Sequence, residues 1–197
     1  MDGMFDQEGA TQITALLRRS EAGEEGAFSS AVARLYPELR RMAAYQLKGG
    51  GQFTLGATDV LHEAYLKLSK HEGAFSNRQH FMAVASKAIR QVTVDYARRR
   101  SAAKRGGEAQ RVEFEEDQLS VEDQAAELLL IDQMLDRLSA EDQRLARIFE
   151  CRFFGGMSDQ DTSAALELPV RTVQRGWAKA KAYMIKLHDD SDVAGHE

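Results

Sequence analysis

The fold is decided by residues 157–187, MSDQDTSAALELPVRTVQRGWAKAKAYMIKL. Ser158 can cap a first helix, and Asp161, three residues later, can return the contact in a capping box. Pro169 then interrupts the pattern, because proline has no amide hydrogen to donate and fixes φ near a value suited to the first turn of a helix. A second helix is therefore predicted from Val170. Two helices joined by so tight a turn predict a helix-turn-helix.

The second predicted helix has one apolar side and one basic side. Apolar residues recur from Val173 to Met184 at spacings of four, three and four, which predicts a single buried stripe. The other faces carry basic and polar side chains and no acid, and such a helix fits the major groove of DNA, about 12 Å wide. An ordinary amphipathic hairpin with a solvated basic face is the alternative. The side chains placed to meet DNA are Arg171, Thr172, Gln174, Arg175 and Lys179.

The composition indicates an all-helical protein of a reducing compartment. The chain has 197 residues, only two prolines and a single cysteine, Cys151, which excludes an internal disulfide and favours the cytoplasm. No apolar run approaches the roughly 20 residues that a membrane span needs, and no signal peptide is recognisable. The histidines and Cys151 lack the spacing of metal ligands, and no carboxylate is paired with a nucleophile or base. We therefore expect neither an enzyme nor a cofactor or metal site.

Upstream of the helix-turn-helix, apolar periodicity predicts further helices. One runs from Thr11 to about Glu21, one from Phe28 to Leu47 with a bend or interruption at Pro37, and two more over residues 59–69 and 80–100. Residues 113–127 are predicted to be a linker rather than a helix. After it, helices are predicted over residues 128–138 and from a cap made by Ser139 with Asp142. The expected architecture is all-α, with two small helical domains joined by an acidic linker.

The charges are distributed unevenly along the chain. The formal net charge is −5, but residues 90–105 contain six basic residues and one acid, whereas residues 112–127 contain seven acids and no base. Such asymmetry indicates one face for nucleic acid and another for a basic partner. Phe75, Phe81 and Tyr96 lie near the arginines and could stack on bases of single-stranded DNA. Burial in the core is the alternative for these rings.

Several segments together resemble the extracytoplasmic-function (ECF) sigma factors of bacteria. LSAEDQRLARIFECRFFGGMSDQDTSAALELPVRTVQRGWAKAKAYMIKL resembles their region 4, and AGEEGAFSSAVARLYPELRRMA resembles the start of their region 2. ATDVLHEAYLKL followed by FMAVASKAIRQVTVDYARRR resembles the part of region 2 that binds core polymerase and melts the promoter. The resemblance covers residues 11–187. It implies a region 2 domain over 11–107, a linker over 108–127 that threads the RNA-exit path, and a region 4 domain over 128–188.

The resemblance also implies roles for individual residues. The partners would be core RNA polymerase, through its β′ clamp helices and β flap, and promoter DNA, with no membrane involved. The five residues of the second predicted helix named above, from Arg171 to Lys179, would read the −35 element. The residues that would bind the polymerase core are Asp59, His62, Glu63 and Leu66. The residues that would contact the −10 element are Phe75, Ser76, Asn77, Arg90, Gln91, Asp95, Arg98, Arg99 and Arg100.

The sequence departs from the family pattern at three places. Glu167 and Pro169 stand where the turn usually has glycine and a capping Ser or Thr, and Gln91 replaces an asparagine of the melting helix. The stretch before the core-binding helix is normally an acidic run, but here it contains only one carboxylate, Asp59. This resembles a subgroup in which a Ser/Thr protein kinase supplies the missing charge, here at Thr58. An ordinary N-cap is the other role open to Thr58.

The interpretation is a sigma factor that directs core RNA polymerase to promoters and initiates transcription, with phosphorylation at Thr58 as its activating step. The alternative is a stand-alone helix-turn-helix transcriptional regulator. That alternative expects a ligand-binding or phospho-acceptor domain before the motif, and residues 11–105 show no alternation of strands and helices for one.

Overall fold

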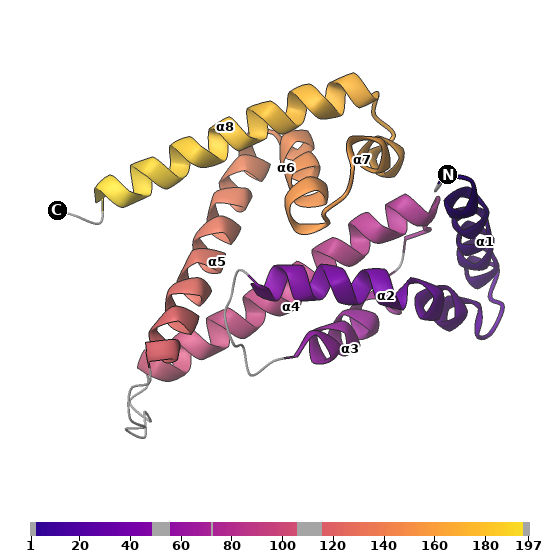
Figure 1. Ribbon diagram of the computed structural model, residues 1–197, viewed down its shortest axis with the longest axis horizontal. Coiled ribbons are helices and arrows are strands. Elements are labelled where there is room, and N and C mark those ends of the chain that lie inside the picture. The colour runs from indigo at the N-terminus through magenta and orange to yellow at the C-terminus, as the bar shows by residue number, and fades with distance from the viewer. Residues whose placement is uncertain (1–2, 49–55, 72, 106–115, 195–197) are drawn as a thin grey trace.

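The computed structural model describes the backbone of residues 3–48, 56–71, 73–105 and 116–194, and the side chains of 9–47, 56–71, 73–102 and 125–190 (Figure 1). Every regular element in these ranges is helical, which confirms the predicted all-α class. None of the described helices combines the length and the apolar character that a bilayer crossing requires. The elements are α1 (Gly3–Glu21), α2 (Ala27–Lys48), α3 (Ala57–Leu68), α4 (Arg78–Arg105), α5 (Glu116–Glu141), α6 (Gln143–Phe149), the short π-helix η1 (Glu150–Phe154), α7 (Asp159–Leu166) and α8 (Val170–Ala194).

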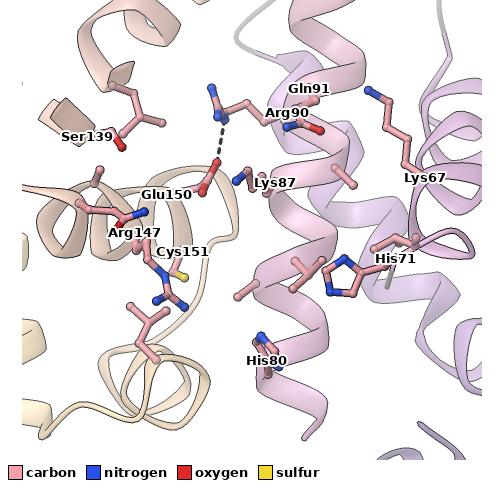
Figure 2. A pocket seen from close by; sticks show the side chains of 18 of the residues that line it. Lys67, His71, His80, Lys87, Arg90, Gln91, Ser139, Arg147, Glu150 and Cys151 are labelled. Carbon is pink, nitrogen blue, oxygen red and sulfur yellow. Dashed lines mark hydrogen bonds and ion pairs between the residues drawn. The ribbon is translucent and has the colours of Figure 1, made fainter. Parts of the chain in front are cut away.

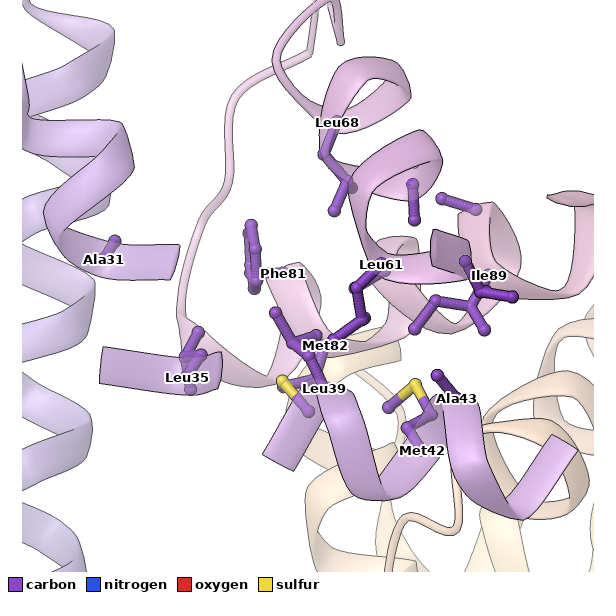
Figure 3. Close-up of a cluster of buried hydrophobic side chains, with 14 of the residues drawn as sticks. Ala31, Leu35, Leu39, Met42, Ala43, Leu61, Leu68, Phe81, Met82 and Ile89 are labelled. Atoms are coloured by element: carbon purple, nitrogen blue, oxygen red, sulfur yellow. The ribbon is translucent and has the colours of Figure 1, made fainter. Parts of the chain in front are cut away.

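The N-terminal half, α1 to α4, packs around one hydrophobic core. The long helix α4 contacts each of the other three helices. Its apolar residues recur every three or four positions, so they lie on one buried side. Phe81 and Ile89 of α4 are fully buried against Leu35 of α2 and Leu61 of α3 (Figure 3). This core fixes α4 as the central helix of the half.

The C-terminal half, α5 to α8, has a second core of its own. Met134 and Leu138 of α5, Phe149 of α6 and Met184 of α8 are buried together. Between η1 and α7 the chain turns at Gly155, where a Cβ atom would lie 2.5 Å from the carbonyl oxygen of Cys151. Glycine is therefore required there, and this turn leads the chain into the helix-turn-helix, as the sequence predicted.

The two halves lie against each other along α4. Its first turns contact α7, its middle contacts η1 and its later turns contact α5 (Figure 1). A third, small apolar cluster forms at this contact, where Ala83 of α4 packs against Cys151, Met157 and Ala165. The described halves are therefore not separated by an extended tether.

Three local predictions are corrected by the structure, and one is narrowed. Helix α1 begins at Gly3, ahead of the predicted start at Thr11. Of the bend or interruption predicted at Pro37, the interruption is excluded, because α2 continues through this proline. Residues 116–127, predicted as linker, form the first half of α5, because glutamates are good helix formers and acids near a helix N-terminus interact favourably with its dipole. Residues 108–115 of the predicted linker lie outside the described residues. The cap of α6 is Asp142 rather than Ser139, and its carboxylate accepts the backbone N–H of Leu145 at 3.0 Å.

Candidate nucleic-acid and polymerase interface

The helix-turn-helix predicted from the sequence is confirmed in α7, its turn and α8. Ser158 caps α7, since its hydroxyl oxygen accepts the backbone N–H of Asp161 at 3.0 Å. Glu167 ends α7 with φ 54° and ψ 41°, in the left-handed conformation that glycine usually supplies. Helix α8 begins at Val170, directly after Pro169, as expected for proline at a helix start. The turn thus orients α8 against α7, and the outer side of α8 is left for a ligand.

That outer side of α8 carries exposed cations. All the residues predicted to read the −35 element are exposed except Thr172, which is half-buried. Within the described residues, neither Arg171 nor Arg175 forms an ion pair with an acid. Gln174 donates from its side-chain amide to the Asp159 carboxylate at 3.3 Å, which joins the recognition helix to α7. Both guanidinium groups are therefore free to meet a phosphate or a base edge.

Most of the −10 residues predicted on α4 also reach solvent. The Arg98 side chain is 57% exposed, although its Nη2 lies 2.9 Å from Oδ2 of Asp132 on α5. Asp95 forms an exposed ion pair with Lys67 of α3 at 3.4 Å, so its negative charge is locally compensated. The members of the set that are exposed or half-buried are Gln91, Asp95, Arg98, Arg99 and Arg100.

Arg90 is the exception among the predicted −10 residues of α4. Its side chain is buried, with the residue only 8% exposed. The guanidinium group pairs with Asp132 of α5, and its Nε donates to Oε1 of Glu150 in η1 at 2.8 Å. Burial raises the pKa of the Asp132 carboxyl, and the positive charges of Arg90 and Arg98 oppose that shift. In this conformation Arg90 is bound to protein carboxylates and is not available to DNA.

Sequence reasoning did not find the two acids that bind Arg90. They lie 42 and 60 residues further along the chain, so no local spacing relates them to α4. One signal was present: Asp132 interrupts the apolar run of residues 128–135, LLLIDQML. An acid in such a run is expected to be buried and therefore paired with a cation.

The segment before α4 is divided between core and surface. Phe75 was predicted to meet DNA, but it is 6% exposed and its ring packs edge-on against Phe81, 5.1 Å between centroids. Ser76 is exposed. Asn77 is half-buried and donates from its amide to the carbonyl oxygen of Ala164 in α7 at 3.3 Å. In this conformation only part of the predicted −10 loop faces solvent.

The residues predicted to bind the polymerase core lie together on α3. Asp59 and His62 are exposed, Glu63 is half-buried, and Leu66 leaves 46% of its surface exposed, unusual for a leucine. The Asp59 carboxylate accepts the backbone N–H of Gly56 at 3.0 Å. The exposed face of α3 is thus partly apolar and partly polar. Asp59, the single acid in the first turn, is already hydrogen-bonded to the N-cap residue.

Thr58 is exposed in the first turn of α3, but it does not cap the helix. The N-cap is Gly56, whose backbone is extended at φ −74° and ψ 158°, and α3 begins at Ala57. The suggestion that Thr58 is an ordinary N-cap is therefore wrong. Its hydroxyl therefore lies near the N-terminus of α3 but does not cap the helix.

A cleft of about 730 Å³ is lined by residues of α3, α4 and the C-terminal half (Figure 2). Lys87 of α4 and Arg147 of α6 line it, and neither forms an ion pair within the described residues. Burial lowers the pKa of His80, and the positive charges of Arg147 and His71 lower it further. Burial also raises the pKa of Cys151, at the wall of the cleft, to about 12. Among the described residues, no three His, Cys, Asp or Glu side chains are grouped as metal ligands would be.

The sequence matches the family model described as ECF sigma factor over residues 10–190. The chain belongs to the ECF sigma factor family. Members of the family bind core RNA polymerase and promoter DNA, so this sigma factor directs transcription initiation, and the match does not favour a stand-alone regulator. No curated protein sequence matches the chain.

Proposed function

We propose that this sigma factor recognises a two-part promoter, and that it acts as a specificity subunit rather than as an enzyme. The observation that carries the proposal is the pair of separate basic surfaces, one on the outer side of α8 and one around Arg98 to Arg100 of α4. The first would read the −35 element and the second, with the Ser76–Asn77 segment, the −10 element. The exposed face of α3 would bind the β′ clamp helices of the polymerase, and the C-terminal half would bind the β flap.

Reconstitution with core RNA polymerase tests this proposal. Holoenzyme assembled with the sigma factor is incubated with fragmented genomic DNA, and the DNA that it retains is sequenced. We expect a shared two-part motif in the retained fragments and weak, salt-sensitive DNA binding by the free sigma factor, because its net charge is −5. Tight binding of the free protein to one duplex site at physiological salt would contradict the proposal.

The −35 assignment is tested at Arg175, with Lys186 as the matched control. Both are exposed cations on α8, but Lys186 lies beyond the part of the helix assigned to the −35 element. A bidentate contact from arginine to guanine discriminates against the wrong base by about 1–3 kcal/mol. Arg175→Ala should therefore relax the preference at one upstream position about tenfold or more, while Lys186→Ala leaves the motif unchanged. An unchanged motif with Arg175→Ala would remove this residue from the recognition set.

The −10 assignment predicts a kinetic effect at Arg99, which is exposed and unpaired within the described residues. Strand capture follows docking, so Arg99→Ala should slow promoter opening more than it weakens recruitment of the holoenzyme. Permanganate reactivity of unpaired thymines measures opening, and gel shifts of closed complexes measure recruitment. Equal opening rates for variant and wild type would count against the assignment.

We further propose that a Ser/Thr protein kinase activates the sigma factor by phosphorylating Thr58. The hydroxyl is exposed, and the only acid in the first turn of α3 is Asp59, which already accepts a hydrogen bond from Gly56. A phosphate would add about −1.5 to −2 charges at a helix N-terminus, where negative charge is favoured. It would also offer acceptor oxygens to arginines of the polymerase. The unmodified surface would bind the polymerase weakly.

Alanine substitution separates this role from a structural one. Because Gly56 is the cap, Thr58→Ala should leave the free energy of unfolding within about 0.5 kcal/mol of wild type, alanine being the better helix former. The same variant should abolish transcription in cells, whereas Thr58→Glu should restore part of it. Ser69→Ala, an exposed hydroxyl at the other end of α3, is the control. Full transcription activity and unchanged polymerase affinity with Thr58→Ala would contradict activation by phosphorylation at Thr58.

A further inference from the structure

The first turn of α7 is joined to the recognition helix α8 by a side-chain hydrogen bond. The side-chain amide of Gln174 donates to Oδ2 of Asp159 at 3.3 Å. Gln174 is exposed on α8, between Arg171 and Arg175 in the sequence, and it belongs to the set assigned to the −35 element. Asp159 is half-buried and is not a member of that set. The bond therefore links a residue assigned to base reading with an acid of the neighbouring helix.

The Asp159 carboxylate is itself held by Arg152 of η1. Nε of Arg152 lies 3.3 Å from Oδ1 of Asp159, and both atoms are buried and form no hydrogen bond within the described residues, so this ion pair compensates their burial. Arg152 also donates from Nη1 to the carbonyl oxygen of Met157, and its guanidinium carbon lies 5.5 Å from the centroid of the Trp177 ring. These three contacts fix the arginine, and the arginine fixes the carboxylate.

The bond to Asp159 determines which end of the Gln174 amide faces α7. A glutamine amide has a donor end, its NH2 group, and an acceptor end, its carbonyl oxygen. An ionised carboxylate accepts hydrogen bonds and donates none, so only the nitrogen of Gln174 can face it. The carbonyl oxygen is consequently directed away from Asp159, because nitrogen and oxygen lie on opposite sides of the amide carbon.

An amide held in this orientation can distinguish the two strands of a base pair. In the major groove, adenine and cytosine present an amino group, whereas thymine and guanine present a carbonyl oxygen. The outward oxygen of Gln174 accepts from an amino group and is repelled by a carbonyl oxygen. A freely turning amide would fit both, because it could offer its oxygen to the first and its NH2 group to the second. Fixing the amide therefore adds sequence information.

We propose that Asp159 is a positioning residue for promoter recognition. By holding the amide nitrogen of Gln174, it makes one position of the −35 element favour the amino-bearing bases, adenine and cytosine, on one strand. The inference rests on the proposed −35 role of α8. Asp159 acts through Gln174 and makes no contact of its own with the promoter, and Arg152 keeps the carboxylate in place.

Selection from a DNA library with a randomised −35 element tests this assignment. Holoenzyme is assembled with wild type or a variant, and the DNA that it retains is sequenced. The position at which Gln174→Ala changes the base preference is the one that Gln174 reads. Wild type should favour adenine and cytosine there on one strand over thymine and guanine. A preference shared by adenine and guanine, or by adenine and thymine, on one strand would overturn the inference.

Two variants of equal charge provide the decisive comparison. Asp159→Ala should reduce the strand discrimination at this position about two- to tenfold, the range expected from one hydrogen bond. Asp161→Ala removes the same charge from the same turn of α7, but the Asp161 carboxylate is bonded to the Ser158 hydroxyl at 2.6 Å and not to α8. This control should discriminate as wild type does. Equal discrimination by the two variants would overturn the inference.

Coupling between two substitutions separates positioning from direct contact. In the Gln174→Ala background, Asp159→Ala should have no further effect on this position, because no amide remains to be oriented. If Asp159→Ala had the same effect in both backgrounds, Asp159 would act on the promoter without Gln174, and the inference would be overturned.

The NMR signals of the Gln174 side-chain amide supply a readout in the free sigma factor. Their absence in Gln174→Ala assigns them. Asp159→Ala should shift these signals, whereas Asp161→Ala should leave them in place; unshifted signals in Asp159→Ala would overturn the inference alone. This measurement needs neither DNA nor polymerase. A holoenzyme without any upstream base preference would instead overturn the proposed −35 role, and with it the part of Asp159 in recognition, even where the signals shift.

Discussion

Replacing Glu167 with glycine is expected to stabilise the helix-turn-helix. Among the described residues, Glu167 is the one non-glycine residue with positive φ, at 54°. This conformation costs an L-residue roughly 1–2 kcal/mol, whereas glycine adopts it freely but loses about 0.5–1 kcal/mol more in backbone entropy on folding. The side chain is exposed and forms no hydrogen bond or ion pair within the described residues. The balance predicts a gain of about 0.5–1 kcal/mol in the free energy of unfolding.

Urea unfolding followed by Trp177 fluorescence measures this gain. Trp177 is the only tryptophan and lies on α8, its ring centroid 5.6 Å from that of Phe149, so its emission reports the C-terminal half. Gln160→Gly is the matched control, because the same residue inside helix α7 should cost about 0.5–1 kcal/mol. A loss of stability with Glu167→Gly, or equal effects at the two positions, would refute the account of the turn.

Two further predictions concern the same half and the cleft. Asp142→Ala removes the carboxylate that accepts the Leu145 amide, and should cost about 1 kcal/mol, measured by urea unfolding; a cost near zero would mean that another group caps α6. The pKa of His80 lies below its ordinary value of 6.5, because of burial and then of Arg147 and His71, so the folded chain binds this proton less readily than the unfolded chain. Stability should therefore be complete above that ordinary value and fall as the pH is lowered through it, and His80→Asn should flatten the fall; an identical pH profile would contradict the assignment.

Local patterns in the sequence predicted the helix-turn-helix well. A capping serine, a proline at the restart and an apolar stripe all act within a few residues, so each constrains the backbone directly. The stripe from Val173 to Met184 is buried at Val173, Ala180 and Met184, as its spacing predicted. The all-α class follows for the same reason, since helical periodicity is a local property.

Contacts between distant segments were beyond the reach of the same reasoning. The acids of residues 116–127 were interpreted as linker because their charge dominates the pattern, yet that charge suits the start of a long helix. The partners of Arg90 depend on how the two halves meet, which no spacing along α4 encodes. A contact with DNA was therefore predicted for Arg90, whereas its burial depends on residues of α5 and η1.

The separation of the two cores has a consequence for how such chains can be recombined. Since the cores share no residue, the C-terminal half of a related protein could replace residues 128–188 without repacking α1 to α4. What such an exchange must preserve is the sign of charge at two positions, those of Asp132 and Glu150. A hybrid with neutral side chains there would keep both cores but lose the ion pairs that join the two halves. Matching charges at these two positions therefore determines which C-terminal halves can be exchanged between relatives.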